Sequence, residues 1–421
     1  MQKNWYRLDT AALIFPAITR RDWCNVFRVS ATLSEPVAPD VLQQAADDLR
    51  PRFPSFYVTL HRGVFWYYLE ESRRRVTVRE DYAYPLTFMS SRELRQNCLR
   101  VLYYKNRIAV EFFHSLSDGR GGSVFLCNLV ARYLELRYGL VIPRDGTIRD
   151  LSEPPQPEEL EDSFWRYAAE VAAGRKEAYS YRLHGTRAVR GFKYLTTGIV
   201  DTQALLDNAH SYGVSITALL AAIMTQSVME MQVLEQPRRR QRPVKMTIPV
   251  DLRRLFDSRT LRNFSLVLNV GADPRYGEYS LEQLCRTIYH QLCAGATPQI
   301  MAGMIAANVQ PQQLTVLRLA PVFIKNIVMD LIYRDSERCG SLNISNLSVL
   351  SLPEVMRPYV ERMEFIIGPQ RTYPNNCSVL SYGGKTYINM IRSIRESELE
   401  RRFFSKLVEL GIAVDIESNG S

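Results

Sequence analysis

Alternating hydrophobic and polar positions predict β-strands along much of the chain. In residues 107–113, Ile108, Val110 and Phe112 alternate with their neighbours, which is the period-two pattern of a strand that buries one face. Residues 99–104 form a second such run, and Lys105-Asn106 between the two predicts a hairpin turn. Further strands are predicted at residues 25–33, 56–60, 64–69, 193–200, 244–250, 264–270, 341–347, 362–367, 378–382 and 386–391.

Apolar residues spaced three and four positions apart predict helices between these strands. One helix is expected to begin near Gly119, because Phe125, Leu129 and Tyr133 lie on one of its faces. Residues 215–231 are apolar almost all round, as in a buried helix. Other helices are predicted at residues 39–49, 162–177, 202–210 and 396–410, and in much of 281–333. Sheet and helix therefore occur in both halves, which predicts an α/β (α+β) fold.

The length of the chain and one proline-rich segment predict two domains. At 421 residues the chain is too long for one ordinary core. Residues 143–161 are rich in proline and acidic residues, which is typical of a loop, here near the end of the first half. We therefore predict two lobes, residues 1–185 and 186–421, with a boundary placed to within about ten residues.

Composition and cysteine usage indicate a globular protein with reduced thiols. The most apolar stretches are far shorter than the roughly 18 residues of a membrane span, and the N-terminal apolar run contains Pro16 and lacks a signal-peptide cleavage pattern. The seven cysteines are scattered and never form C-x-x-C, which predicts mostly buried thiols rather than disulfides or a zinc site. We expect a cytoplasmic location, no membrane span and no bound metal.

The net charge of +9 is accompanied by two arginine clusters. They are Arg73-Arg74-Arg75, and Arg238-Arg239-Arg240 followed by Arg242. Such clusters are most often solvated loop edges, but they could also attract a phosphate-bearing partner or the acidic surface of a carrier protein. Nucleic acid is not expected, because no recognised binding motif accompanies them.

A histidine motif, H-S-L-S-D-G at residues 114–119, carries the clearest chemical signal. His114 follows a predicted strand and precedes a predicted helix, a position at the end of a rigid element where functional sites gather. Asp118 can cap the helix or meet a basic partner, and Gly119 allows close approach of the backbone. The alternative is an ordinary core histidine beside an aspartate helix cap. A dinucleotide-binding loop is excluded, because G-x-G-x-x-G requires glycine where Val124 stands.

At these residues the sequence resembles the coenzyme A-dependent acyltransferase superfamily, which includes chloramphenicol acetyltransferase, plant BAHD acyltransferases, alcohol O-acetyltransferases and peptide-synthetase condensation domains. Their shared signature is H-x-x-x-D-G, matched here by His114, Asp118 and Gly119. The run V-D-L-R at residues 250–253 resembles the V-D-x-R element of the plant enzymes, with Arg253 as its arginine. The resemblance extends over essentially the whole chain and is closest to bacterial alcohol acetyltransferase-like members.

Three departures separate the chain from particular branches. It has no D-F-G-W-G motif, which argues against the plant branch. Phe113 stands where condensation domains have the first of two histidines, and Leu266-Val267 replace their usual Asn-Thr. What remains is the resemblance to a stand-alone, two-lobed bacterial acyltransferase.

The resemblance implies both an architecture and a mechanism. The two lobes would be chloramphenicol-acetyltransferase-like, each a mixed sheet with helices, and would form a V around a central active-site tunnel. His114 would be the catalytic base, because a neutral imidazole with a pKa near 6.5 can accept the proton of an alcohol or amine. The acceptor would then attack a thioester directly, without an acyl-enzyme. Asp118 would pair with Arg253 and, with Gly119, hold the loop in shape.

The resemblance leaves the substrates open. The acyl donor would be a coenzyme A thioester or an acyl group on the phosphopantetheine of a carrier protein, in either case a co-substrate rather than a resident cofactor. Ser345 and Asn346 are guesses for the oxyanion donor from strand position and stay outside the predicted catalytic set. A non-catalytic scaffold of the same fold is the remaining alternative. We expect a monomer, because two lobes in one chain can build a complete tunnel.

Overall fold

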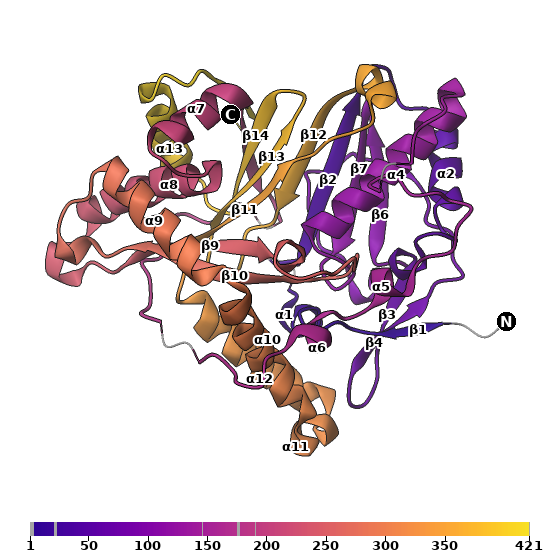
Figure 1. Cartoon of the computed structure of the whole chain (residues 1–421), viewed down its shortest axis with the longest axis horizontal. Helices are drawn as coiled ribbons and strands as arrows, with labels where there is room; N and C mark the ends of the chain where they lie inside the picture. Colours follow the sequence, from indigo (N-terminus) through magenta and orange to yellow (C-terminus); the bar gives the residue numbers. More distant parts are fainter. Residues whose placement is uncertain (1–3, 21–22, 145, 175–176, 190, 421) are drawn as a thin grey trace.

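Three sheets form the framework of the computed structural model, which describes residues 4–20, 23–144, 146–174, 177–189 and 191–420 (Figure 1). The first sheet has the order β12 (Val360–Ile367), β2 (Val26–Leu33), β7 (Arg107–Phe113), β6 (Leu99–Tyr104), β5 (Arg79–Glu80). The second has the order β10 (Ser265–Ala272), β9 (Val244–Asp251), β11 (Leu342–Val349), β13 (Asn375–Tyr382), β14 (Lys385–Arg392), β8 (Tyr194–Asp201), β15 (Val414–Ser418). A small third sheet has the order β1 (Trp5–Arg7), β4 (Tyr67–Glu71), β3 (Val58–Arg62).

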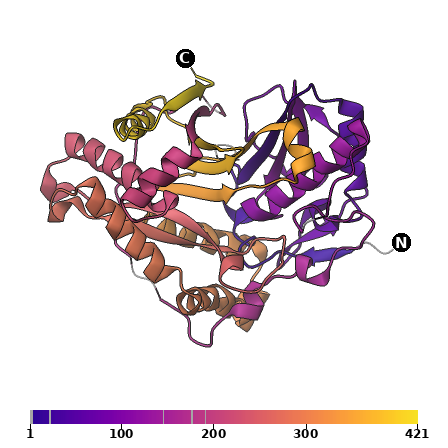
Figure 2. The same cartoon turned by 45° about the horizontal axis from the view of Figure 1, so that its top comes forward.

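Helices pack against each large sheet (Figures 1 and 2). The first sheet is covered by α4 (Gly119–Tyr138), with α2 (Pro39–Asp48) beside it. The second is covered by α7 (Thr202–Ser211), α8 (Ile216–Glu235), α9 (Leu281–Gly295) and α13 (Glu398–Glu409). Figure 1 shows a third group extending downward, namely α10 (Pro298–Gln313), α11 (Thr315–Leu319) and α12 (Val322–Glu337). The short helices are α1 (Phe15–Ile18), α3 (Ser91–Leu94), α5 (Pro157–Leu160) and α6 (Phe164–Tyr167).

The local signals of the sequence explain the elements around the motif. Strands β6 and β7 occupy the two predicted ranges and are joined at Lys105, whose φ of 51° suits a tight turn. Helix α4 begins at Gly119, where the Asp118 side chain accepts a hydrogen bond from the Gly121 amide, and it ends at Tyr138, which is followed by Gly139 with φ 67°. The strand-to-helix connection that carries His114 is therefore fixed at both ends.

Two hydrophobic cores support the α/β (α+β) fold, which the sheets and helices of both halves confirm. One core surrounds the first sheet and includes Phe27, Phe112 and Phe125; the other lies around α8 and the second sheet. The boundary near residue 185 stays a prediction. Residues of the second half nevertheless complete the first sheet, because β12 pairs antiparallel with β2.

The helix predicted at residues 162–177 is wrong. Only α6 is helical there, and the backbone beyond it runs without regular structure in the described residues. The amides of Ala169 and Ala173 donate instead to the carbonyls of Ala302 and Gly303 in α10, at 3.1 and 2.9 Å. Alanine favours helix in isolation, but these tertiary hydrogen bonds use the backbone groups that a helix would need.

Helix α8 is long and apolar enough to cross a membrane, which corrects the expectation that no segment reaches that length. Its most apolar window is 67% buried within the protein, as is usual for a core helix. The bent pair α9 and α10 passes the same test only when counted together, across a bend of 67°. All seven cysteines are free thiols and most are buried, as predicted.

Candidate active site

A large cavity lies beside the end of β7 and the start of α4. Its volume is about 1680 Å³, and its walls include His114 from the first half and residues of β9, β10 and β11 from the second. Ligand pockets commonly measure roughly 300–1,000 Å³. This cavity therefore has room for two substrates at once.

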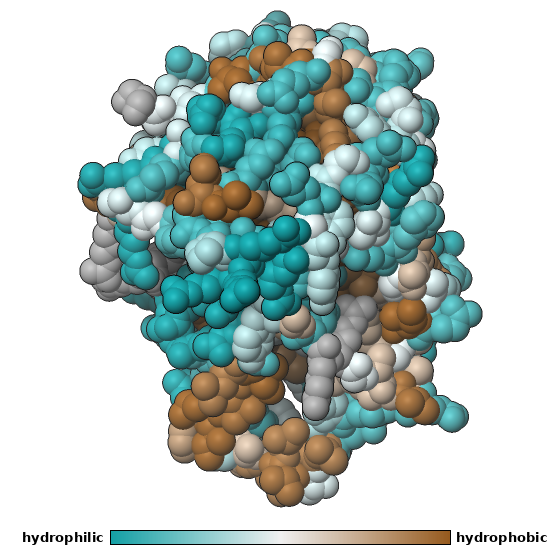
Figure 3. All heavy atoms as spheres, turned by 90° about the vertical axis from the view of Figure 1, so that its left-hand side faces the viewer, coloured by the Kyte–Doolittle hydropathy of each residue, from teal (hydrophilic) through white to brown (hydrophobic). Residues whose placement is uncertain are grey.

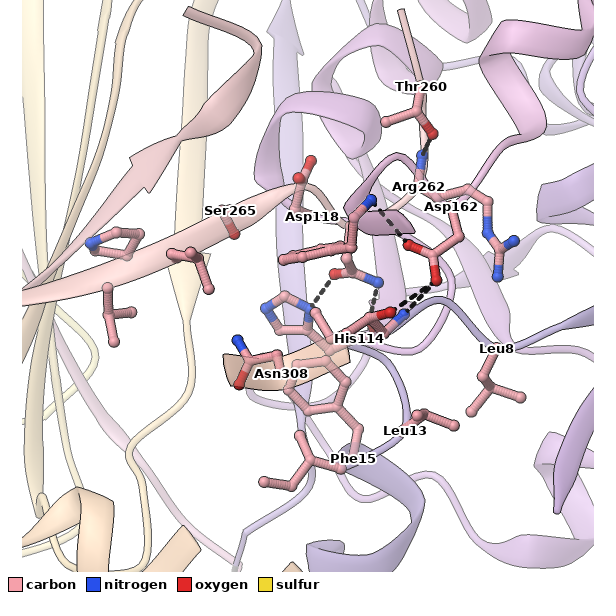
Figure 4. A pocket seen from close by; sticks show the side chains of 18 of the residues that line it. Leu8, Leu13, Phe15, His114, Asp118, Asp162, Thr260, Arg262, Ser265 and Asn308 are labelled. Atoms are coloured by element: carbon pink, nitrogen blue, oxygen red, sulfur yellow. Dashed lines mark hydrogen bonds between the residues drawn. The ribbon is translucent and has the colours of Figure 1, made fainter. Parts of the chain in front are cut away.

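His114 is held in place on the cavity wall by its backbone and by two aromatic rings. Its amide donates to the carbonyl of Asn25 at 2.9 Å. The Phe15 ring stacks on the imidazole, with centroids 4.3 Å apart, and the Phe27 ring forms a T-shaped pair with it, with centroids 5.2 Å apart. The ring thus keeps one orientation and retains an edge toward the cavity (Figure 4).

Asn263 determines which nitrogen of His114 carries the proton. The Asn263 Nδ2 group donates to the carbonyl oxygen of His114 at 3.0 Å and to Oδ2 of Asp9 at 3.1 Å. Its Oδ1 therefore faces Nδ1 of His114, 3.1 Å away. Because an amide oxygen only accepts, Nδ1 of the neutral ring must be the donor. Nε2 of the His114 ring then holds the lone pair.

Burial changes the ionisation of both His114 and Asp9. It lowers the pKa of His114 below the ordinary 6.5, although the nearby Asp118 carboxylate acts in the opposite direction. Burial also raises the pKa of Asp9 to about 6, against the influence of the Arg262 guanidinium. His114 is therefore neutral and Asp9 mostly ionised at pH 7, the combination that keeps Asn263 in this orientation.

Asp118 forms the predicted ion pair with Arg253. Its Oδ2 accepts from Nη1 of Arg253 and from the amide of Phe264, both at 2.9 Å, while its Oδ1 caps α4. Arg253 also donates to Oδ1 of Asp251 at 2.9 Å and to the carbonyl of Thr260 at 2.8 Å. These contacts join the start of α4 to the segment between β9 and β10. Asp118 and Asp251 raise the pKa of Arg253 despite its burial.

Glycine is required in the first turn of α4 for reasons of space. A Cβ on Gly119 would lie 2.7 Å from the Leu347 side chain. A Cβ on Gly121 would lie 2.2 Å from the carbonyl oxygen of Leu261, which is backbone and cannot swing away. The helix start and the β9–β10 connection therefore meet more closely than any side chain allows.

Of the other residues that the sequence analysis named, some line the cavity and others lie away from it. Ser345 and Asn346 both line the cavity, but the Asn346 amide is already bonded to Thr217 Oγ1 and to the Ser348 amide, at 3.0 and 2.7 Å. Phe113, at the position of the first condensation-domain histidine, is fully buried in the core. In the described part of the chain, no group of three or more His, Cys, Asp or Glu residues could hold a metal ion.

Besides Arg253, several basic residues at the cavity come from positions that the sequence did not single out. The described wall includes Arg120, Arg149, Arg254 and Arg259. The two predicted arginine clusters are not part of that wall, and Arg75 instead donates to Asp47. The interpretation of these clusters as solvated edges fits the structure better.

Asn263, Asp9 and Phe15 were missed as site residues. Asn263 directly precedes a predicted strand, but nothing in the sequence linked Asn263 or Phe15 to His114. Asn263 and Asp9 lie 254 positions apart in the chain. Only the folded chain brings them together.

Comparison with known proteins gives matches at the level of structure. No protein-family model and no curated protein matches the sequence. TRI101 of F. graminearum, solved with coenzyme A and T-2 mycotoxin, aligns with a TM-score of 0.66 at 10% identity, covering 98% of this chain and 100% of its own. TRI3 trichothecene 15-O-acetyltransferase from Fusarium sporotrichioides aligns at 0.61 and 11% identity, covering 97% and 94%.

A condensation domain aligns equally well. The starter condensation domain of rhizomide synthetase RzmA, solved in complex with C8-CoA, gives a TM-score of 0.64 at 12% identity and covers 97% of this chain and 95% of its own. These identities are low, so the comparison concerns the fold. The chain has the two-lobed fold that the acetyltransferase and the condensation domain share.

Proposed function

We propose that the chain is an acyltransferase that moves an acyl group from a coenzyme A thioester to an alcohol or amine, with His114 as general base. The observation that carries the proposal is the fixed orientation of the His114 imidazole. Asn263 fixes the proton on Nδ1 and leaves the lone pair of Nε2 at the wall of a cavity large enough for two substrates. A histidine that served only the core would not need this arrangement.

The chemistry follows from that lone pair. Nε2 accepts the proton of the acceptor hydroxyl or amine as its oxygen or nitrogen attacks the thioester carbonyl. The tetrahedral intermediate collapses with cleavage of the C–S bond, and the imidazolium returns the proton to the departing thiolate. Ester or amide and free thiol result, and no acyl-enzyme forms.

The tetrahedral oxyanion needs a positioned donor. Of the two residues guessed from the sequence, Ser345 lines the cavity, whereas the Asn346 side-chain amide is already bonded to Thr217. Ser265, at the start of β10, lines the same cavity and is visible in Figure 4. We propose these two hydroxyls as donors, and loss of the correct one should lower kcat roughly 10²-fold.

A phosphate-bearing donor fits the basic part of the wall. Arg120, Arg254 and Arg259 would attract the phosphates of coenzyme A. TRI101 and the RzmA condensation domain, which share the fold, were solved in complex with coenzyme A and with C8-CoA, respectively. Acyl-phosphopantetheine on a carrier protein is the second candidate, because it presents the same thioester. We also propose a monomer in the cytoplasm.

The test is thiol release from acetyl-, butyryl- and palmitoyl-coenzyme A in the presence of pooled alcohols and amines. We expect acceptor-dependent release that is lost in His114→Ala and kept in His210→Ala, a matched change at an exposed histidine on α7. If the folded wild type released no thiol from coenzyme A donors but did so from carrier-bound thioesters, the donor would be the carrier. Release from neither would favour the non-catalytic scaffold.

A further inference from the structure

The group formed by α11, α12 and the turn between β3 and β4 presents an unusually apolar exterior. Brown spheres gather at the lower end of the molecule in Figure 3, where α11 and α12 lie. We call this the α11–α12 surface; its members, each more than half exposed, are Val64, Val316, Leu319, Phe323, Ile327 and Leu331. An exposed apolar patch of this size usually marks a site that binds a membrane or another protein.

The β3–β4 turn is fastened to α12, so the surface is continuous. The Val322 amide donates to the carbonyl of Val64 at 2.8 Å. Nζ of Lys325 donates to the carbonyl of Phe65 at 2.7 Å and lies 4.3 Å from the centre of the Trp66 ring. These contacts hold Val64 and Trp66 beside the exposed helix.

Helix α12 has two apolar rows with different surroundings. Ile324, Val328 and Ile332 line the cavity that contains His114. Phe323, Ile327 and Leu331, one position earlier in each turn, lie outside that wall and are 55–61% exposed. The helix therefore presents apolar side chains both to the cavity and to the exterior, and Arg318 and Lys325 join the inner row on the cavity wall.

The charge pattern favours an anionic lipid surface over other occupants. The sequence has no Asp or Glu between Glu282 and Asp330, while Arg318 and Lys325 lie within that stretch. Basic residues, tryptophan and large aliphatic side chains together are typical of helices that lie at a bilayer interface. A second copy of the chain would bring the same cations against each other in a two-fold contact. An acidic carrier protein is a poorer fit, because the α11–α12 surface has few cations to pair with its carboxylates and many exposed apolar side chains.

We propose that the α11–α12 surface docks on membranes with anionic headgroups, and that the cavity behind it takes a substrate with a long alkyl chain from that membrane. The second part rests on the proposed acyltransferase function; the first part does not. Docking of this kind is peripheral, with the outer row of α12 buried among headgroups and upper acyl chains.

The experiment is co-sedimentation of the full chain with vesicles of phosphatidylcholine and 30% phosphatidylglycerol. We expect most of the protein in the pellet, less than one third as much with pure phosphatidylcholine, and a similar loss at high salt. The double variant Phe323→Glu with Ile327→Glu should lose binding at least tenfold. The matched control, Val408→Glu with Ile416→Glu, changes exposed apolar residues of α13 and β15 and should bind like wild type.

Three outcomes would overturn the proposal. They are failure of the wild type to bind anionic vesicles, equal loss in both double variants, and a lipid-free dimer in sedimentation velocity that only Phe323→Glu with Ile327→Glu abolishes, which would identify a second copy as the occupant. Equal thermal melting of all variants shows that the charges did not unfold the chain. With acetyl-coenzyme A and a short soluble alcohol the docking variant should turn over like wild type, so a loss there points to the catalytic site rather than to docking.

Discussion

Replacing Asp118 by asparagine should test the link between the motif and the second half of the chain. Asp118 and Arg253 have side chains only 8% and 11% exposed, and their contact is 2.9 Å. Asparagine can still accept from the Gly121 amide and cap α4, but its amide group cannot also accept from both Arg253 and the Phe264 amide. The change therefore removes the ion pair while leaving the cap.

The expected loss of stability depends on the hydrogen bonds that Arg253 keeps in the variant. Removing one partner of a buried pair costs about 3–5 kcal/mol, because the other charge stays buried. Arg253 keeps Asp251 at 2.9 Å and the carbonyl of Thr260 at 2.8 Å, so the lower end applies. We expect Asp118→Asn to lower the free energy of unfolding by about 3 kcal/mol, a large part of the roughly 5–15 kcal/mol usual for a protein.

Equilibrium urea unfolding, followed by circular dichroism and tryptophan fluorescence, measures this directly. The midpoint should fall by about 1 M or more at an m-value near 3 kcal/mol/M. Glu354→Gln, in an exposed pair 3.9 Å from Arg357, is the control and should change stability by less than about 0.5 kcal/mol. A loss below about 1 kcal/mol in Asp118→Asn, or strict additivity of Asp118→Asn and Arg253→Gln, would refute the assigned coupling.

Three further predictions concern the imidazole and the helix start. Asn263→Ala should lower kcat about 10- to 100-fold with a smaller change in KM, because a buried hydrogen bond worth about 1–3 kcal/mol no longer selects the tautomer; unchanged kcat would contradict this. Since burial lowers the pKa of His114 and the proposed mechanism requires the neutral imidazole, kcat/KM should stay level down to pH 6.5 and decline only below it, more steeply as Asp9 protonates near 6; a decline that begins above pH 7 would exclude this base. Gly121→Ala should lower Tm by several degrees, whereas Gly174→Ala, where a Cβ meets nothing within 4 Å, should not; equal Tm values would show that α4 can shift freely.

Local patterns were sufficient for most elements and for the motif. The strands at residues 99–104 and 107–113 were predicted at their observed bounds because their alternation and turn depend only on neighbours. The Asp118 cap and the glycine after it are equally local. The pairing with Arg253 came from the resemblance, and the structure forms it.

The failures have a common physical cause, which is contact between distant segments. Residues 168–174 are not helical because the amides of Ala169 and Ala173 bond to α10. Strand β12 was predicted as a strand but not as a partner of β2, since alternation shows that a strand buries a face and not which edge it joins. The apolar exterior of α12 was read as part of a helical region, because its two rows look like one buried stripe until the cavity is seen.

The candidate site is the place where these distant contacts converge. The His114 ring comes from the end of β7, its tautomer is set by Asn263 before β10, and Asn263 is oriented by Asp9 near the start of the chain. None of His114, Asn263 and Asp9 is arranged for catalysis without the other two. The ion pair of Asp118 with Arg253 joins the same parts of the two halves. The arrangement proposed for the base is therefore formed only when both halves are folded against each other. A change at this junction should affect the ionisation of His114 even when no substrate-contacting residue is altered, which is why the pH profile of Asn263→Ala is more informative than its activity at a single pH.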